Sequence, residues 1–257
     1  MKIIETHCHL DYLKAMPLAE ILKISKEAGI EKIITIGVDP QNLDRVFEIS
    51  NENENIYFTQ GIHPHDAKEC NDDVLKKVDA RCSEKKMLAV GEIGLDYHYD
   101  NSPRQKQIEV FKSHLEIAIK NKKPVVIHSR DADEDMISVL SEYAPRLDKK
   151  GVIHSFTSGE ELAKKALDLG FYLGFNGIIT FKSAQNVRDI AKLCPLDKML
   201  VETDSPFLTP VPNRGKENNP SNLPHIINKL AEIKNTTPEE ISEATYINAN
   251  KLFFEIV

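Results

Sequence analysis

The sequence predicts a (β/α)8 barrel that forms a single domain over residues 1–257. Two observations support this fold. Apolar runs typical of strands alternate with amphipathic segments typical of helices throughout the chain. Residues able to bind a metal also close strand-like runs near both ends of the chain, and a barrel gathers the carboxyl ends of its strands on one face. A doubly wound open sheet, the main alternative, would not bring the first and last strands together so naturally.

Eight apolar runs are expected to form the strands. They are Ile3–Thr6, Ile33–Gly37, Tyr57–Gly61, Leu88–Glu92, Val125–His128, Gly151–His154, Tyr172–Phe175 and Met199–Glu202. Between them, apolar residues recur every three or four positions, which is typical of helices packed on one face. The segments with this pattern include Leu18–Ala28, Leu43–Asn51, Arg104–Asn121, Glu134–Tyr143, Glu160–Leu169 and Ala184–Leu193.

Composition narrows the classes of function. A net charge of −7 argues against broad, sequence-independent adhesion to DNA. It does not exclude a phosphodiester substrate, because divalent ions and a few arginines can supply a local positive field. The four cysteines contain no CxxC pair, so neither a disulfide framework nor a cysteine zinc site is indicated. With no signal-like start and no membrane-length apolar stretch, we expect a cytoplasmic monomer without membrane partners.

The first predicted strand carries a His-X-His motif. His7 and His9 are two positions apart, so an extended chain directs both imidazoles to one side and Cys8 to the other. Neutral imidazole is a common ligand of divalent metals. The motif by itself is weak evidence, since short patterns of this kind also occur without a metal.

Four further residues close predicted strands and strengthen the metal hypothesis. They are Glu92, His128, His154 and Asp204. Each has a structural alternative: a core histidine with its hydrogen bonds satisfied, a carboxylate that caps a helix, or an aspartate that organises the turn before Pro206. Taken together with the histidine pair, they combine imidazoles with carboxylates that zinc, manganese or magnesium accept.

Three motifs give the chain a resemblance to a known family. They are His7-Cys8-His9, Pro-Val-Val-Ile-His-Ser-Arg-Asp-Ala-Asp-Glu at 124–134, and Glu-Thr-Asp-Ser-Pro at 202–206. In this order and at barrel spacing, the chain resembles the TatD family of metal-dependent deoxyribonucleases, within the amidohydrolase-like barrels. Glu5 departs from the aspartate common in that family, lies outside the ligand set and is expected to matter little.

The resemblance implies a centre with two divalent ions, Mg2+, Mn2+, Zn2+ or Ni2+. One ion would be held by His7, His9, Glu92 and Asp204, and the other by Glu92, His128 and His154. Glu92 would bridge the two ions. Cations about 3.5–4 Å apart can activate a water and neutralise charge on a phosphodiester. Asp204 is the expected general base, so that Glu92 and Asp204 are the candidate catalytic residues.

Other polar residues receive supporting roles. His63 and the arginines Arg130 and Arg214 are candidates for contact with a substrate phosphate, although either arginine is equally open to a surface ion pair. His65 and Glu202 are expected to orient ligands from behind. His114 and His225 fall in helical segments, where packing or solvation is favoured, whereas His98 and Asp96 stay unassigned. The proline-rich stretch Thr209–Leu223 is expected to cover the site.

The leading functional prediction is a hydrolase that cuts DNA phosphodiester bonds and trims single strands from the 3′ end. A second interpretation keeps the metals but changes the substrate to an ester, such as a D-amino acid linked to tRNA. A third is a metal-binding adaptor without catalysis, which the intact Asp204 disfavours. A cyclic-amide hydrolase is disfavoured because the bridging position carries Glu92 rather than a lysine that could form a carbamate.

Overall fold

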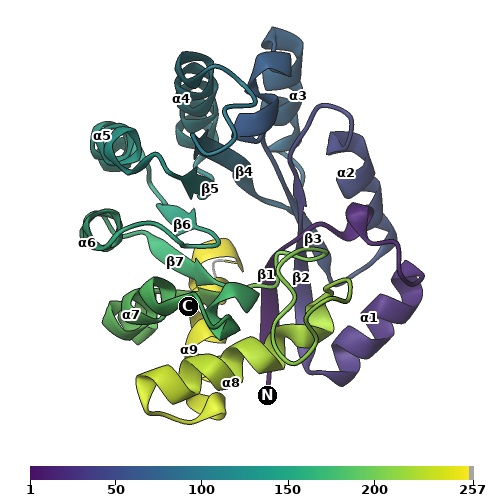
Figure 1. Cartoon of the computed structure of the whole chain (residues 1–257). Helices are drawn as coiled ribbons and strands as arrows, with labels where there is room; N and C mark the ends of the chain where they lie inside the picture. Colours follow the sequence, from purple (N-terminus) through teal and green to yellow (C-terminus); the bar gives the residue numbers. More distant parts are fainter. Residues whose placement is uncertain (255–257) are drawn as a thin grey trace.

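A computed structural model describes residues 1–254 and shows eight parallel strands in the order β1 to β8, with helices outside them (Figure 1). The strands are β1 (Ile3–Cys8), β2 (Ile30–Gly37), β3 (Ile56–Gln60), β4 (Met87–Asp96), β5 (Val125–Arg130), β6 (Gly151–Ile153), β7 (Tyr172–Phe175) and β8 (Met199–Val201). The predicted (β/α)8 barrel is confirmed.

Nine α-helices in residues 1–254 surround the strands. They are α1 (Leu18–Glu27), α2 (Leu43–Glu52), α3 (Asp72–Arg81), α4 (Arg104–Asn121), α5 (Asp133–Tyr143), α6 (Glu160–Asp168), α7 (Gln185–Leu193), α8 (Leu223–Lys234) and α9 (Pro238–Ala249). None of the helices in this range is both long and apolar enough to cross a membrane.

The structure differs from the predicted elements in two instructive places. Strand β4 continues to Asp96, so Glu92 lies inside the strand instead of at its end. Helices α3, α8 and α9 were not among the predicted ranges. Two of them carry a start signal in the sequence: the Asn71 side chain accepts hydrogen bonds at the start of α3, and Thr237 and Glu240 form a capping box at the start of α9.

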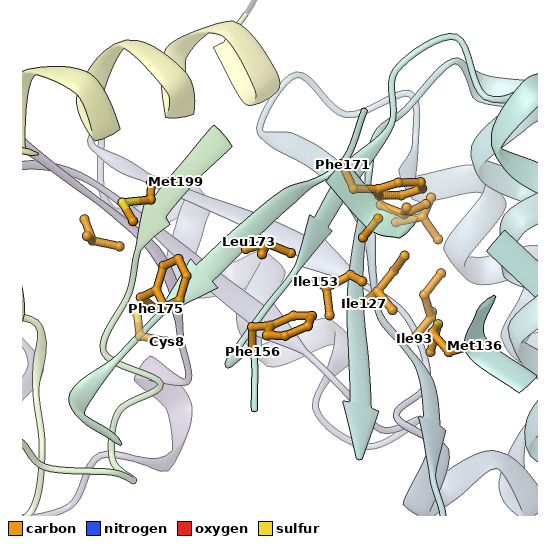
Figure 2. Close-up of a cluster of buried hydrophobic side chains, with 14 of the residues drawn as sticks. Cys8, Ile93, Ile127, Met136, Ile153, Phe156, Phe171, Leu173, Phe175 and Met199 are labelled. Atoms are coloured by element: carbon orange, nitrogen blue, oxygen red, sulfur yellow. The ribbon is translucent and has the colours of Figure 1, made fainter. Parts of the chain in front are cut away.

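Apolar side chains form two layers, one on each side of the strands. The outer layer lies between the strands and the helices, and Figure 2 shows Ile127, Ile153 and Leu173 following one another on β5, β6 and β7. Residues next to these along the strands, such as Val126 and Val152, belong to a separate inner cluster. That cluster includes Leu252 and Phe253 from the short π-helix η7 (Asn250–Phe254), which therefore closes the end of the barrel opposite the candidate site.

The first and last strands meet at a polar seam. The Asp204 N–H donates to the His7 carbonyl at 2.9 Å. The buried Glu5 carboxylate accepts from the His7 N–H at 3.1 Å, the Thr203 N–H at 2.9 Å and the Thr203 hydroxyl at 2.7 Å. Burial raises the pKa of Glu5 to about 8. Glu5 lies outside the candidate ligand set as predicted, but it joins the two strands that carry His7 and Asp204.

Candidate metal centre

Parallel strand order brings the six predicted ligands together at the carboxyl ends of the barrel strands. His7 lies on β1, Glu92 on β4 and His128 on β5. His9, His154 and Asp204 follow directly after β1, β6 and β8. His128 and His154 each stand two residues after an inner-cluster valine, so strand alternation turns both imidazoles toward the barrel axis. Cys8 points the other way into the outer layer, as predicted.

Glu92 lies at the centre of this cluster. Its Oε1 is 2.8 Å from His154 Nε2, 3.0 Å from His128 Nδ1 and 3.4 Å from His63 Nε2. Its Oε2 is 3.3 Å from His7 Nε2. One carboxylate therefore faces imidazoles from both halves of the cluster.

Asp204 closes the cluster on the opposite side from β4. Its Oδ1 is 3.5 Å from His9 Nε2 and 3.7 Å from His7 Nε2. The residue has a positive φ of 55°, a conformation that aspartate tolerates better than most residues. Its side chain keeps 14% of its surface exposed, so the carboxylate reaches solvent while it contacts the two histidines.

The donor set fits divalent cations. Three groups in residues 1–254 place their ligand atoms within 4.8 Å of one another: His7, His9 and Asp204; His7, His154 and Glu202; and His63, Glu92 and His128. The Nδ1 atoms of His7 and His9 and the Oε2 atom of Glu202 are also buried without a hydrogen-bond partner in this part of the chain. Unpartnered buried polar atoms are costly, and a bound cation can satisfy such groups.

The charges of the cluster favour cation binding. Burial opposes ionisation of Glu92, but His154, His63 and His128 outweigh it and hold its pKa well below the usual value. Burial likewise opposes ionisation of Asp204, and its hydrogen bond with His9 and the charge of His7 lower its pKa. Both carboxylates are therefore ionised at neutral pH.

Asp96, which the sequence left unassigned, is a supporting residue of the site. Its Oδ2 lies 2.9 Å from His128 Nε2 and 3.1 Å from His65 Nε2. Burial raises its pKa, but the hydrogen bonds with His128 and His65 overcome that effect and lower it. Because Nε2 of His128 is engaged by Asp96, Nδ1 is left to face Glu92. The available signal was its spacing: Asp96 lies four positions after Glu92 on the same strand.

Glu202 lies beside His154, and its predicted role of orienting a ligand stays a prediction. Its Oε1 accepts the Ser155 N–H at 2.6 Å and lies 3.5 Å from His154 Nδ1. His154 therefore stands between two carboxylates. Burial opposes its protonation, but Glu92 and Glu202 raise its pKa well above the usual value.

The cluster opens into a cavity of about 1560 Å3 at the mouth of the barrel. His63 and Arg130, the predicted phosphate contacts, line it, and so does His65, which was predicted to orient a ligand. Arg214 is not among the lining residues: its guanidinium stacks over the Phe181 ring at 3.9 Å and donates to the Thr209 carbonyl at 3.3 Å. That placement favours a role in bracing the loop, and the phosphate contact of Arg214 stays a prediction.

The proline-rich loop also lies differently from expectation. Phe207 and Leu208, just before it, line the cavity, whereas residues 209–223 are not among the lining residues. Asn218 fixes the start of this segment by donating to the carbonyls of Thr203 at 3.0 Å and Phe207 at 2.7 Å. The proline-rich stretch thus supports the wall of the cavity, and the residues before it contact the cavity.

The remaining histidines lie outside the cluster. His114 is buried in α4, where its Nδ1–H donates to the Val110 carbonyl at 2.8 Å. His225 lies in α8 with Nε2 at 3.5 Å from the Asn213 amide. His98 lines the cavity at its exposed edge and pairs with Asp131 at 2.8 Å.

Comparison with known proteins identifies the family. The model of the family described as TatD related DNase matches residues 4–254. The chain belongs to the TatD family. It is 38% identical over 252 residues to an uncharacterized metal-dependent hydrolase, YabD, of Bacillus subtilis, with 98% of each chain covered. It is 30% identical over 240 residues to the protein of Erwinia tasmaniensis named 3′-5′ ssDNA/RNA exonuclease TatD, covering 91% of this chain and 92% of the relative.

A solved structure supports the same assignment. The crystal structure of YjjV, a TatD homologue from Escherichia coli K12, superposes with a TM-score of 0.91 at 29% identity and covers 98% of both chains. The predicted family and barrel are therefore confirmed. The predicted enzyme class, a metal-dependent hydrolase acting on ester bonds, is confirmed at the level of the family.

Proposed function

We propose that this TatD-family protein hydrolyses phosphodiester bonds of single-stranded DNA, removing nucleotides from the 3′ end. The observation that carries the proposal is the position of Glu92, whose two oxygens face His7 on one side and His128 and His154 on the other. The name of the Erwinia relative supports the choice of a single-stranded nucleic acid. We further propose that the protein acts as a monomer in the cytoplasm.

Six residues would hold two divalent cations in this proposal. His7, His9 and Asp204 would bind the first, His128 and His154 the second, and Glu92 would serve both. The chemistry that bound Mg2+, Mn2+, Zn2+ or Ni2+ supplies here is Lewis acidity toward water and phosphoryl oxygens. His65, whose N–H donates to His63 Nδ1, and Glu202, which lies beside His154, would keep these imidazoles in position.

The side chains around the cluster have separate tasks. The ionised carboxylate of Asp204 reaches the cavity and would accept a proton from the water that attacks phosphorus. His63, with 14% of its side chain exposed beside Glu92, and Arg130 would contact the phosphate oxygens. As the new P–O bond forms, the bond from phosphorus to the leaving 3′ oxygen breaks.

The test is cleavage of single-stranded DNA labelled at the 5′ end, with added Mg2+ or Mn2+ and with chelator. The wild type is expected to give a metal-dependent ladder that shortens from the 3′ end. Asp204→Asn should abolish it, because the amide cannot accept a proton from the attacking water and is a weaker metal ligand than the carboxylate. Asp131→Asn is the matched control, because it removes an acidic side chain from the same cavity without touching the cluster. Uncut DNA in every lane, under conditions where a control nuclease cuts, would reject the proposal.

A second candidate, hydrolysis of an aminoacyl ester on tRNA, is favoured by the acidic wall of the cavity. Asp131, Asp133, Glu134 and Asp135 line it next to the cluster. Such a wall suits the ammonium group of an amino acid better than a run of phosphates. Turnover of D-aminoacyl-tRNA compared with that of DNA separates the two candidates. Metal retention with turnover of neither would indicate the third possibility, a metal-binding adaptor.

A further inference from the structure

Two exposed aromatic side chains border the cavity of the metal centre. Tyr99 is 57% exposed and Phe207 is 52% exposed. No other phenylalanine or tyrosine within residues 1–254 belongs to the large hydrophobic side chains that are exposed. Both rings line the same cavity. Exposed aromatic rings are costly to leave in water, so their coincidence at one site indicates a function there.

The backbone N–H of each aromatic residue donates a hydrogen bond to an aspartate of the site. The Tyr99 N–H donates to Oδ1 of Asp96 at 3.3 Å, and Oδ2 of the same side chain faces His128. The Phe207 N–H donates to the carbonyl of Asp204 at 3.0 Å. In both cases the aromatic residue follows the aspartate by three positions. These bonds tie the backbone of both aromatic residues to the candidate metal centre.

The barrel places the two rings on opposite sides of the cluster. Tyr99 follows β4 and Phe207 follows β8, and these strands are four positions apart in a ring of eight. The Phe207 ring lies 6.1 Å from the ring of His9. The Tyr99 ring lies 5.5 Å from that of His65, and the Arg130 guanidinium stands over it at 4.9 Å.

The cavity has few positive side chains to attract phosphates, so base stacking is the main available source of affinity for a nucleic acid. Arg104 and Arg130 are the only arginine or lysine side chains of residues 1–254 that line it, against an acidic wall at α5. The net charge of −7 also disfavours broad, sequence-independent adhesion to a phosphate backbone. Stacking of bases on aromatic rings is independent of sequence and requires unpaired bases.

Building on the proposed nuclease function, we propose that Tyr99 and Phe207 are stacking platforms for the two bases that flank the scissile phosphate. A strand crossing the mouth from the β4 side to the β8 side places its phosphate at the cluster and one base on each ring. In a duplex the bases are already stacked and paired, so the platforms select single strands. Arg130, seated on Tyr99, lies where it can contact the phosphate next to the stacked base.

The test combines ring variants with abasic substrates. Binding of a fluorescein-labelled oligothymidylate is measured by anisotropy in an Asp204→Asn background, and turnover is measured with Asp204 intact. Tyr99→Leu or Phe207→Leu should each weaken binding by about five- to a hundred-fold, the scale of one stacked base. An abasic site on the matching side should weaken wild-type binding similarly and have little further effect in the corresponding variant. Tyr99→Phe should retain binding.

Ile247→Ala is the matched control, since it removes an exposed apolar side chain that does not line the cavity. Cleavage with unchanged binding and KM in both leucine variants would overturn the platforms and leave the nuclease proposal standing. Stacking-dependent binding without any cleavage would support the platforms and reject the nuclease. Binding of neither single strands nor duplex by the wild type would reject both.

Discussion

Two buried histidines in different regions of the barrel have pKa values shifted in opposite directions. His154 at the mouth and His114 in the helix layer are 3% and 0% exposed. Burial opposes protonation of both. Glu92 and Glu202 nevertheless raise the pKa of His154 well above its usual value. His114 has only the Val110 carbonyl as a hydrogen-bond partner among the described residues, and its pKa falls to about 4.

The difference shows that two carboxylates beside a buried imidazole can outweigh the effect of burial on its pKa. At the mouth, Glu92 and Glu202 lie on two sides of His154 and favour positive charge there. In the helix layer, the same residue type has no carboxylate beside it in the described structure and stays neutral. Substitutions that remove these partners should therefore have effects that differ between the two regions.

Glu92→Gln should remove the negative charge at the centre of the histidine cluster. The amide keeps the shape but loses the charge that faces His7, His128 and His154. We expect kcat/KM on DNA to fall about a thousand-fold or more, the scale of losing a charge-stabilising group in contact with the reacting atoms. Calorimetry should also show fewer bound metal ions. Glu134→Gln, at the rim of the same cavity, is the control, and equal loss in both variants would contradict the assignment.

His114 should make the protein less stable in acid. Its pKa is about 4 when folded and near 6.5 when unfolded, so the unfolded chain binds more protons in that interval. The free energy of unfolding therefore falls as pH decreases from about 7 to 4, by about 3 kcal/mol from this residue. Urea unfolding in chelator measures it. In His114→Leu this part of the pH dependence should disappear. If the free energy of unfolding changes with pH in the same way in both proteins, His114 does not titrate as inferred.

Asp96→Asn should lower the affinity of the site for metal without removing a candidate metal ligand. The asparagine can no longer hold His128 with an ionised carboxylate, so Nδ1 is less firmly directed at Glu92. We expect metal affinity to fall about ten- to a hundred-fold, the usual effect of losing such a support. Asp131→Asn breaks an exposed histidine–carboxylate pair and should leave metal affinity unchanged. Equal affinities for the Asp96 variant and wild type would remove Asp96 from the site.

The smallest expected effect is a difference in KM for DNA between variants of Arg130 and Arg214. Arg130→Gln should raise KM for DNA about ten-fold, because a charged hydrogen-bond donor is lost from the cavity. Arg214→Gln should leave KM within about two-fold and lower only the melting temperature, since this side chain braces Phe181 and Thr209. Steady-state kinetics and thermal unfolding of both variants give the comparison. A larger KM effect from Arg214 would support the phosphate contact predicted from the sequence.

The sequence by itself determined the repeating pattern and the candidate ligands. Strand alternation is a local property, so periodic apolar runs identify the strands, and polar residues at their carboxyl ends indicate the face of the barrel that carries the site. Tyr172–Phe175 was predicted with its observed bounds. His7, His9 and Asp204, from opposite ends of the chain, could be grouped because parallel topology leaves little choice of where they meet.

Only the tertiary structure decided how these residues act on one another. The central position of Glu92 depends on β4 extending past it, and the role of Asp96 depends on a neighbouring strand placing His128 within 2.9 Å. Likewise, Arg130 reaches the cavity whereas Arg214 does not. Such contacts join residues far apart in the chain, and their direction is set by strand register and packing that no local pattern records.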